Sequence, residues 1–226
     1  MKKILIVLLA ALLVLAAVAC KAKEEPQEAA ENEIVDGPLA GGWTPAEDFS
    51  ITDERQAIFD KGMAVISSIH TPLAYLGSQV VAGTNHCFLS KGSNWLELVY
   101  FYEDLQGDVQ LMNVADMPLV PQEDGTAIAP EEGLMGGWSY AEDPAVTEEI
   151  LTRFSQTLAG KAGVSYAPVA NLGTQVVAGL NRCLLCEVSA PQPHYALVYV
   201  YEKLDGEADI FQVIDLDVGA YCTYGA

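Results

Sequence analysis

Three histidines, His70, His86 and His194, are the side chains of this sequence best suited to acid–base chemistry or metal binding. None of them has a partner at a spacing that indicates catalysis or a metal site. The chain also lacks the Gly-x-Ser-x-Gly, phosphate-loop and His-Glu-x-x-His patterns. We therefore predict that the protein is not an enzyme and has no catalytic residues, bound metal or cofactor.

Four cysteines beyond the leader carry the remaining reactive chemistry. Cys183 and Cys186 have the spacing of a redox or zinc motif, but they lie in a predicted strand, which sends positions i and i+3 to opposite faces. We expect buried apolar cysteines instead. Because export is predicted below, a Cys186–Cys222 or Cys183–Cys222 disulfide stays open, and spacing does not decide the pairing.

One pentapeptide occurs twice and divides the chain into two copies of one unit. Gln79-Val80-Val81-Ala82-Gly83 returns as Gln175-Val176-Val177-Ala178-Gly179. An Asn and a Cys follow each copy at the same spacing, as Asn85 with Cys87 and as Asn181 with Cys183. Each copy predicts a strand, a tight turn and a strand, with glycine allowing positive φ or the close approach of another group. An ordinary hairpin turn is the alternative.

Each unit also predicts one helix followed by four strands. The first helix begins at Ser50 or Thr52 and the second at Thr147, each followed by apolar residues at helical spacing. The expected strands are Leu73–Val80, Thr84–Ser90, Trp95–Tyr102, Val109–Ala115, Tyr166–Val176, Leu180–Val188, Tyr195–Tyr201 and Ala208–Leu216. The predicted fold class is α+β, with two tandem domains that each wrap an antiparallel sheet on one helix.

Composition limits the partners. The net charge of −20 argues against nucleic acid and against electrostatic docking on anionic lipid. The 226 residues leave room for two domains, and we expect a monomer. The predicted segments are a signal peptide at 1–19, an acidic tether at 20–36, a first domain at 37–117, a linker at 118–132 and a second domain at 133–226.

The N-terminus resembles a bacterial lipoprotein signal. A basic start precedes an apolar run, and small residues lead to Cys20. The resemblance implies cleavage before Cys20, acylation of its thiol and export to the bacterial membrane or cell surface. An ordinary secretory leader cut near Ala19 is the alternative. The Glu- and Ala-rich segment that follows predicts a flexible tether, with an amphipathic helix as the second interpretation.

Both copies of the pentapeptide match Gln-x-Val-x-Gly, and the chain here resembles the cystatins, which inhibit papain-like cysteine proteases. Gly41 and Gly136 lie where that family carries a glycine before its helix. The segment from Val80 to Asn85 looks especially like the stefin branch, and the resemblance to the family covers most of both units. It implies three loops at one end of each sheet that enter a protease cleft as a reversible wedge, without a bond to the catalytic thiol.

The implied protease-binding residues follow from matching positions. They are Gly41, Gly42, Gln79, Val80, Val81, Ala82, Gly83 and Leu105 in the first copy, and Gly136, Gly137, Gln175, Val176, Val177, Ala178, Gly179 and Leu204 in the second. A Gly83→Arg change is expected to block binding with little loss of folding. Since both second hairpins lack the Pro and Trp of many cystatins, a non-inhibitory binding or adhesion module of the bacterial envelope is the alternative function.

Overall fold

A computed structural model describes residues 41–131, 134, 136–159, 163 and 165–222. The predicted signal peptide, the tether and the lipidation residue Cys20 lie outside these residues. The elements from Trp43 to Tyr221 belong to one compact unit that spans Pro38–Ala226. Within the described part of the chain, neither α-helix has the length and apolar character needed to cross a membrane.

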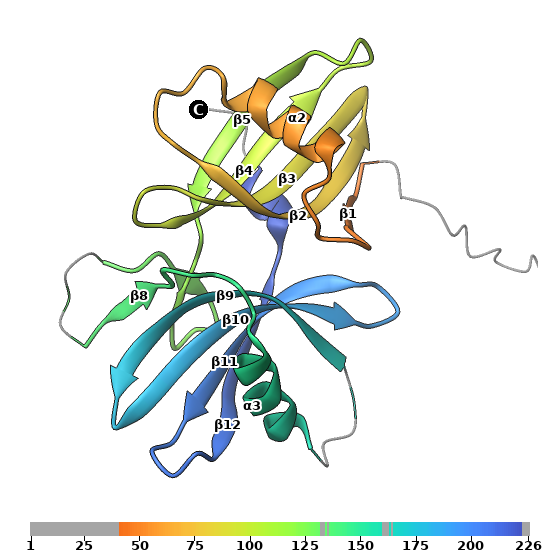
Figure 1. The fold of residues 1–226 in the computed structure, drawn as a ribbon. Helices are drawn as coiled ribbons and strands as arrows, with labels where there is room; N and C mark the ends of the chain where they lie inside the picture. The colour runs from red at the N-terminus through yellow and green to blue at the C-terminus, as the bar shows by residue number, and fades with distance from the viewer. Residues whose placement is uncertain (1–40, 132–133, 135, 160–162, 164, 223–226) are drawn as a thin grey trace, which may run out of the picture. The chain divides into compact units, whose positions relative to one another are not determined.

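The first half of the unit forms a five-stranded antiparallel sheet with one helix (Figure 1). Its strands are adjacent in the sheet in their chain order. The elements are β1 (Trp43–Pro45), α2 (Asp53–Met63), β2 (Thr71–Val81), β3 (Gly83–Lys91), β4 (Leu96–Glu103) and β5 (Val109–Asp116).

The second half repeats this order and ends in a short 3-10 helix. Its elements are β8 (Trp138–Tyr140), α3 (Glu148–Leu158), β9 (Ser165–Val177), β10 (Gly179–Ser189), β11 (His194–Glu202), β12 (Ala208–Leu216) and η1 (Val218–Tyr221). Between the halves, β6 (Val120–Pro121) pairs with β7 (Ala127–Ile128) as a small third sheet. The segment predicted as a linker thus contains a hairpin, and its Leu119 is fully buried.

Both helices begin at a predicted threonine cap. The Thr52 side chain accepts a hydrogen bond from the Arg55 backbone N–H, and Thr147 accepts one from Ile150. In the first helix, Phe59 packs edge to face on Phe88 and Phe101 of the sheet, with ring centroids 5.5 Å apart in each pair. The apolar stripes therefore hold one helix on one face of each five-stranded sheet.

The opposite faces of the two sheets meet in one shared apolar core. In β4, Leu98 and Tyr100 belong to this core, whereas the alternating Val99 and Phe101 contact the helix α2. The strand β11 divides its side chains in the same way between the shared core and α3. A continuous apolar run along a strand is typical of a strand that is buried on both faces, and both β4 and β11 contain such a run.

Buried hydrogen bonds join the two halves across this core. Tyr195 of β11 donates its hydroxyl to the carbonyl of Leu76 in β2, at 2.6 Å. Tyr100 of β4 donates to the carbonyl of Val218 in η1, also at 2.6 Å. Each such bond contributes about 0.5–1.5 kcal/mol net, so the two add directional contacts to the apolar packing of the halves.

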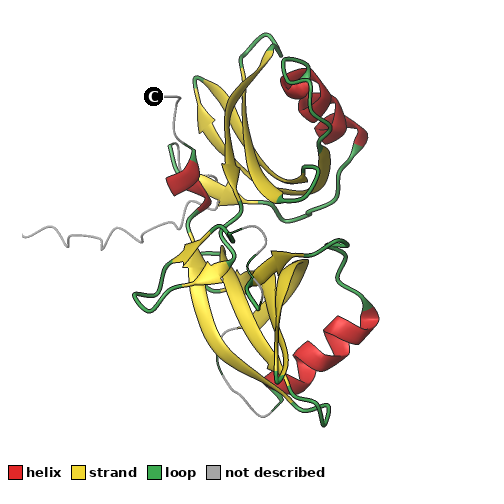
Figure 2. Cartoon of the chain, turned by 90° about the vertical axis from the view of Figure 1, so that its left-hand side faces the viewer, coloured by secondary structure: helices red, strands yellow, loops and turns green. Residues whose placement is uncertain are grey.

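The predicted fold class is wrong. The structure is mostly antiparallel sheet, in three sheets with two α-helices among the described residues (Figure 2), and not two tandem helix-on-sheet domains. The prediction assigned each sheet a single buried face. The strands bury both faces, and the face away from the helix is covered by the other sheet. The helices nonetheless begin where predicted, and the long strands lie close to their predicted ranges.

Candidate functional site

Three segments of the first half lie together at one end of its sheet. Trp43 pairs with Gln79, and the Gly41 backbone N–H donates to the carbonyl of Val80 at 3.1 Å. Thr84 pairs with Glu103, so the β2–β3 turn and the β4–β5 turn lie at the same end. We call the set formed by Gly41, Gly42, Gln79, Val80, Val81, Ala82, Gly83 and Leu105 the first hairpin edge.

The first hairpin edge exposes apolar side chains to solvent. Val80 and Val81 are 43% and 41% exposed, and Leu105 is 80% exposed. None of the three belongs to a core cluster of the described residues. These side chains therefore have apolar area left to bury against a partner.

Side-chain hydrogen bonds hold the segments of this edge to one another. Gln79 donates its amide Nε2 to the carbonyl of Gly41 at 2.8 Å and accepts at Oε1 from the Asn85 amide at 2.7 Å. Tyr102 donates its hydroxyl to the carbonyl of Ala82 at 2.5 Å. The arm and the hairpin are thus fixed before any partner arrives, which reduces the ordering entropy lost on docking.

Gly83 faces its own sheet. It is buried with φ +136°, and a Cβ there would overlap the carbonyl oxygen of Glu103 and lie 2.7 Å from the Tyr102 ring. The expectation that Gly83→Arg would block binding with little loss of folding is therefore wrong. The glycine is required by the packing of β3 against β4, whatever else it contacts.

The second half builds the same arrangement, which we call the second hairpin edge. Gln175 donates to the carbonyl of Gly136 at 3.0 Å and accepts from Asn181 at 2.9 Å, while Tyr201 donates to Ala178 at 2.6 Å. Its members are Gly136, Gly137, Gln175, Val176, Val177, Ala178, Gly179 and Leu204. Among its apolar side chains, Val176 is 71%, Val177 42% and Leu204 87% exposed.

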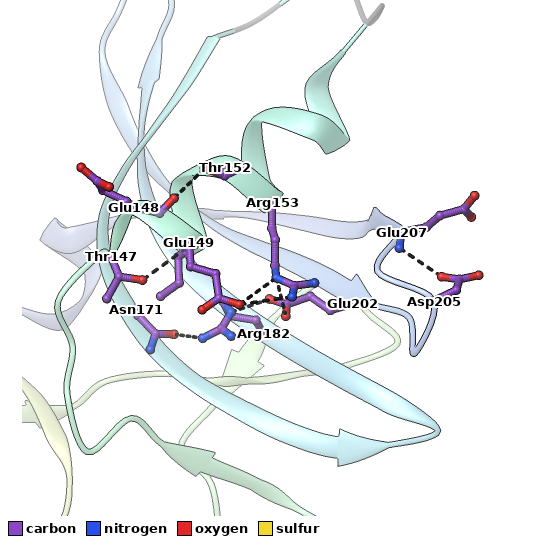
Figure 3. A network of polar contacts seen from close by, with 11 residues as sticks. Thr147, Glu148, Glu149, Thr152, Arg153, Asn171, Arg182, Glu202, Asp205 and Glu207 are labelled. Atoms are coloured by element: carbon purple, nitrogen blue, oxygen red, sulfur yellow. Dashed lines mark hydrogen bonds and ion pairs between the residues drawn. The ribbon is translucent and has the colours of Figure 1, made fainter.

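The two edges differ in the basic residue that contacts a glutamate before the turn with the exposed leucine. Arg182 donates Nε to Glu202 Oε1 at 2.6 Å in the second half, where Arg153 and Glu149 extend the network (Figure 3). The equivalent pair in the first half is His86 with Glu103, at 3.2 Å. Burial lowers the pKa of His86 despite the carboxylate of Glu103. The second hairpin edge thus lies beside the cation of Arg182, and the first lies beside the imidazole of His86, whose charge depends on pH.

The turn that carries Leu204 is acidic but internally paired. Asp205 accepts a hydrogen bond from the Glu207 backbone N–H at 3.0 Å (Figure 3). Lys203 bonds Glu207 at 2.9 Å and Asp209 at 3.1 Å, and these two carboxylates raise the pKa of Lys203. Because the charges neutralise one another in part, the exposed leucine remains the main feature that this turn offers to a partner.

The cysteines are packing residues in the described structure. Cys183 belongs to the shared core, whereas Cys186 packs on the α3 side of the sheet, so the predicted split between faces is confirmed. Burial raises the pKa of the Cys87, Cys183 and Cys186 thiols, which makes them poor nucleophiles. Cys222 packs on the shared core, and all four are free thiols, so neither Cys183–Cys222 nor Cys186–Cys222 is formed.

The histidines each face a different carboxylate. His70 meets Glu97, His86 meets Glu103, and His194 meets Asp215. Within the described ranges, no group of three His, Cys, Asp or Glu side chains is placed to hold a metal ion. Sequence spacing missed these pairs, because their partners come from strands far along the chain.

Comparison with known proteins gives no assignment. No protein-family model matches the chain, and no curated protein is significantly similar to it. The residues that fix the edges, Asn85 with Tyr102 and Asn181 with Tyr201, were also missed as site residues. Their recurrence at matching positions of both copies is the signal that could have found them.

Proposed function

We propose that the two hairpin edges are protein-docking wedges, and that the chain reversibly inhibits papain-like cysteine proteases by filling their substrate cleft. The observation that carries this proposal is the convergence of Gly41, the β2–β3 turn and Leu105 at one fixed, apolar end of a sheet. The match of both pentapeptides to the cystatin pattern supports the choice of protease class.

The geometry supports inhibition by burial of apolar side chains, without a covalent step. Val80, Val81 and Leu105 enter the cleft, where removal of apolar surface from water contributes roughly 25 cal/mol per Å². Gln79 keeps the arm against the hairpin, so that both enter as one body. No group of the edge attacks the catalytic thiol, and release is therefore reversible.

An inhibition titration tests the proposal. We expect the chain to inhibit papain, and a variant with Val80, Val81, Val176 and Val177 all changed to Glu to bind at least about 100-fold more weakly, because each charge opposes burial. Ile128→Glu, at a residue 51% exposed in the small third sheet, is the matched control and should inhibit like the parent. If the parent and the four-site variant inhibit equally, the hairpin edges do not take part in inhibition.

The alternative is a non-inhibitory binding or adhesion module of the bacterial envelope. One observation favours it: Gly83 and Gly179 are both required by the chain's own strands, since a Cβ at either would overlap a neighbouring carbonyl. The repeated glycines are then explained without a protease. Absence of inhibition by a folded parent chain would select this alternative.

A further inference from the structure

Ser68, His70 and Glu97 form a hydrogen-bonded chain of side chains. Ser68 Oγ lies 2.7 Å from His70 Nε2, and His70 Nδ1 lies 2.8 Å from Glu97 Oε2. The His70 and Glu97 side chains are only 7% and 6% exposed. A carboxylate at Nδ1 accepts the Nδ1 proton, which leaves Nε2 free to accept a proton from the serine.

The carboxylate of this chain is held in place from its other side. Trp95 donates its indole Nε1 proton to Glu97 Oε1 at 2.5 Å, so the two carboxylate oxygens have separate donors. Glu97 itself is fixed in β4, where it pairs with Ser90 and Asp116 of the adjoining strands. His70 is therefore oriented by a rigid element, as a base that acts on a hydroxyl must be.

Ser68 is accessible, and its surroundings suit an apolar acyl compound. The residue is exposed, and neighbouring Ile69 is 83% exposed. Within the described residues, the backbone N–H groups of Ser67, Ser68 and Ile69 donate no hydrogen bond. N–H groups that have no acceptor within the protein can donate to a developing oxyanion.

We propose that Ser68 is an activated nucleophile that hydrolyses small esters with an apolar acyl group. Ser68 Oγ attacks the ester carbonyl carbon as its proton passes to His70 Nε2. The carbon–oxygen bond to the leaving alcohol then breaks, and His70 returns the proton to that alcohol. Water next attacks the acyl-serine with His70 as base, which releases the acid and restores Ser68.

This site is separate from the proposed docking edges. His70 directly precedes the first residue of β2, Thr71, whereas Val81 at the other end of the same strand belongs to the first hairpin edge. The proposal does not depend on protease inhibition. A variant at Ser68 leaves the edge residues unchanged, so that failure of one proposal is visible without failure of the other.

Labelling with a fluorophosphonate probe tests the nucleophile. On the full-length chain in mild detergent, we expect one covalent adduct per chain, and mass spectrometry should place it on Ser68. Ser68→Ala should abolish labelling and the hydrolysis of p-nitrophenyl butyrate, and His70→Gln should slow labelling at least about 100-fold. Ser67→Ala removes the neighbouring exposed serine and is the matched control, which should label like the parent.

Glu97 acts through His70 and is a positioning residue. Glu97→Gln should keep the adduct on Ser68 but form it more slowly, because the imidazole loses the carboxylate that accepts its Nδ1 proton. Glu97→Asp, which keeps a carboxylate, should recover part of the labelling rate per folded chain, whereas a merely structural role would change only the amount of folded protein. Absence of an adduct on a folded parent, an adduct on another residue, or equal labelling of His70→Gln would overturn the proposal.

Discussion

Replacement of Gly83 by alanine tests whether the repeated glycine is required by the fold. Gly83 has φ +136°, and the added Cβ would overlap the Glu103 carbonyl oxygen and lie 2.7 Å from the Tyr102 ring. A left-handed φ costs an L-residue about 1–2 kcal/mol. Displacement of a packed neighbour adds about 1–3 kcal/mol. We therefore expect Gly83→Ala to lower the free energy of unfolding by about 2–5 kcal/mol.

Gly125→Ala separates the two contributions. Gly125 lies in the turn between β6 and β7 with φ +83°, and a Cβ there meets no atom within 4 Å. This variant should lose only the cost of its φ angle, about 1–2 kcal/mol. Urea unfolding followed by circular dichroism measures both variants against the parent, with the slope of each transition checked for equality. Equal losses for Gly83→Ala and Gly125→Ala would refute the packing argument.

Three further changes probe the rest of the structure. Tyr195→Phe should lower the free energy of unfolding by about 0.5–1.5 kcal/mol, since the Leu76 carbonyl loses this donor but keeps the hydrogen bond from the Ala46 backbone N–H. Calorimetry should show a single transition for the parent because the sheets share one core, and two independent transitions would contradict that core. Burial lowers the pKa of His86, so the unfolded chain binds more protons than the folded one. The melting temperature should therefore fall as pH drops below about 6.5. His86→Gln should flatten this dependence on pH, and an unchanged slope would refute its assignment to His86. Cys20→Ala should abolish incorporation of a labelled fatty acid into the protein, because the acylated thiol is removed, and unchanged incorporation would contradict lipidation at this residue.

Local structure was predictable because its causes are local. Thr52 and Thr147 are followed by apolar residues at helical spacing, and both cap their helices as expected. The duplicated pentapeptide gave both hairpins at their observed places. Alternation placed Cys183 and Cys186 on opposite faces of one strand, and the structure confirms it.

The packing of the two sheets was not predicted, because it depends on contacts between residues far apart in the chain. Leu98, Val99, Tyr100 and Phe101 are apolar without interruption, and this run indicates two covered faces. It does not say what covers the second face. The answer is the other sheet, through pairs such as Tyr195 and Leu76, which lie 119 positions apart.

The candidate site was predicted in outline, whereas its supporting residues were not. The exposure of Val80 follows from its place at the end of a hairpin strand and that of Leu105 from its place in a turn, but the roles of Asn85 and Tyr102 depend on the register between strands. The same limit hid the pair of His70 with Glu97, whose positions are 27 residues apart. Spacing along the chain does not predict which residues a sheet brings together.

Comparison of the two halves separates what the edges require from what they tolerate. The Gln–Asn–Tyr hydrogen bonds recur at equivalent atoms in both, with donor–acceptor distances from 2.5 to 3.0 Å. The basic residue beneath them differs, since His86 stands where the second half has Arg182. A plain hairpin needs no side chain to fix an N-terminal arm beside it. The retention of that fixation in both copies, while the neighbouring ion pair changed, indicates that the position of the arm relative to the exposed valines is what the duplicated edges preserve.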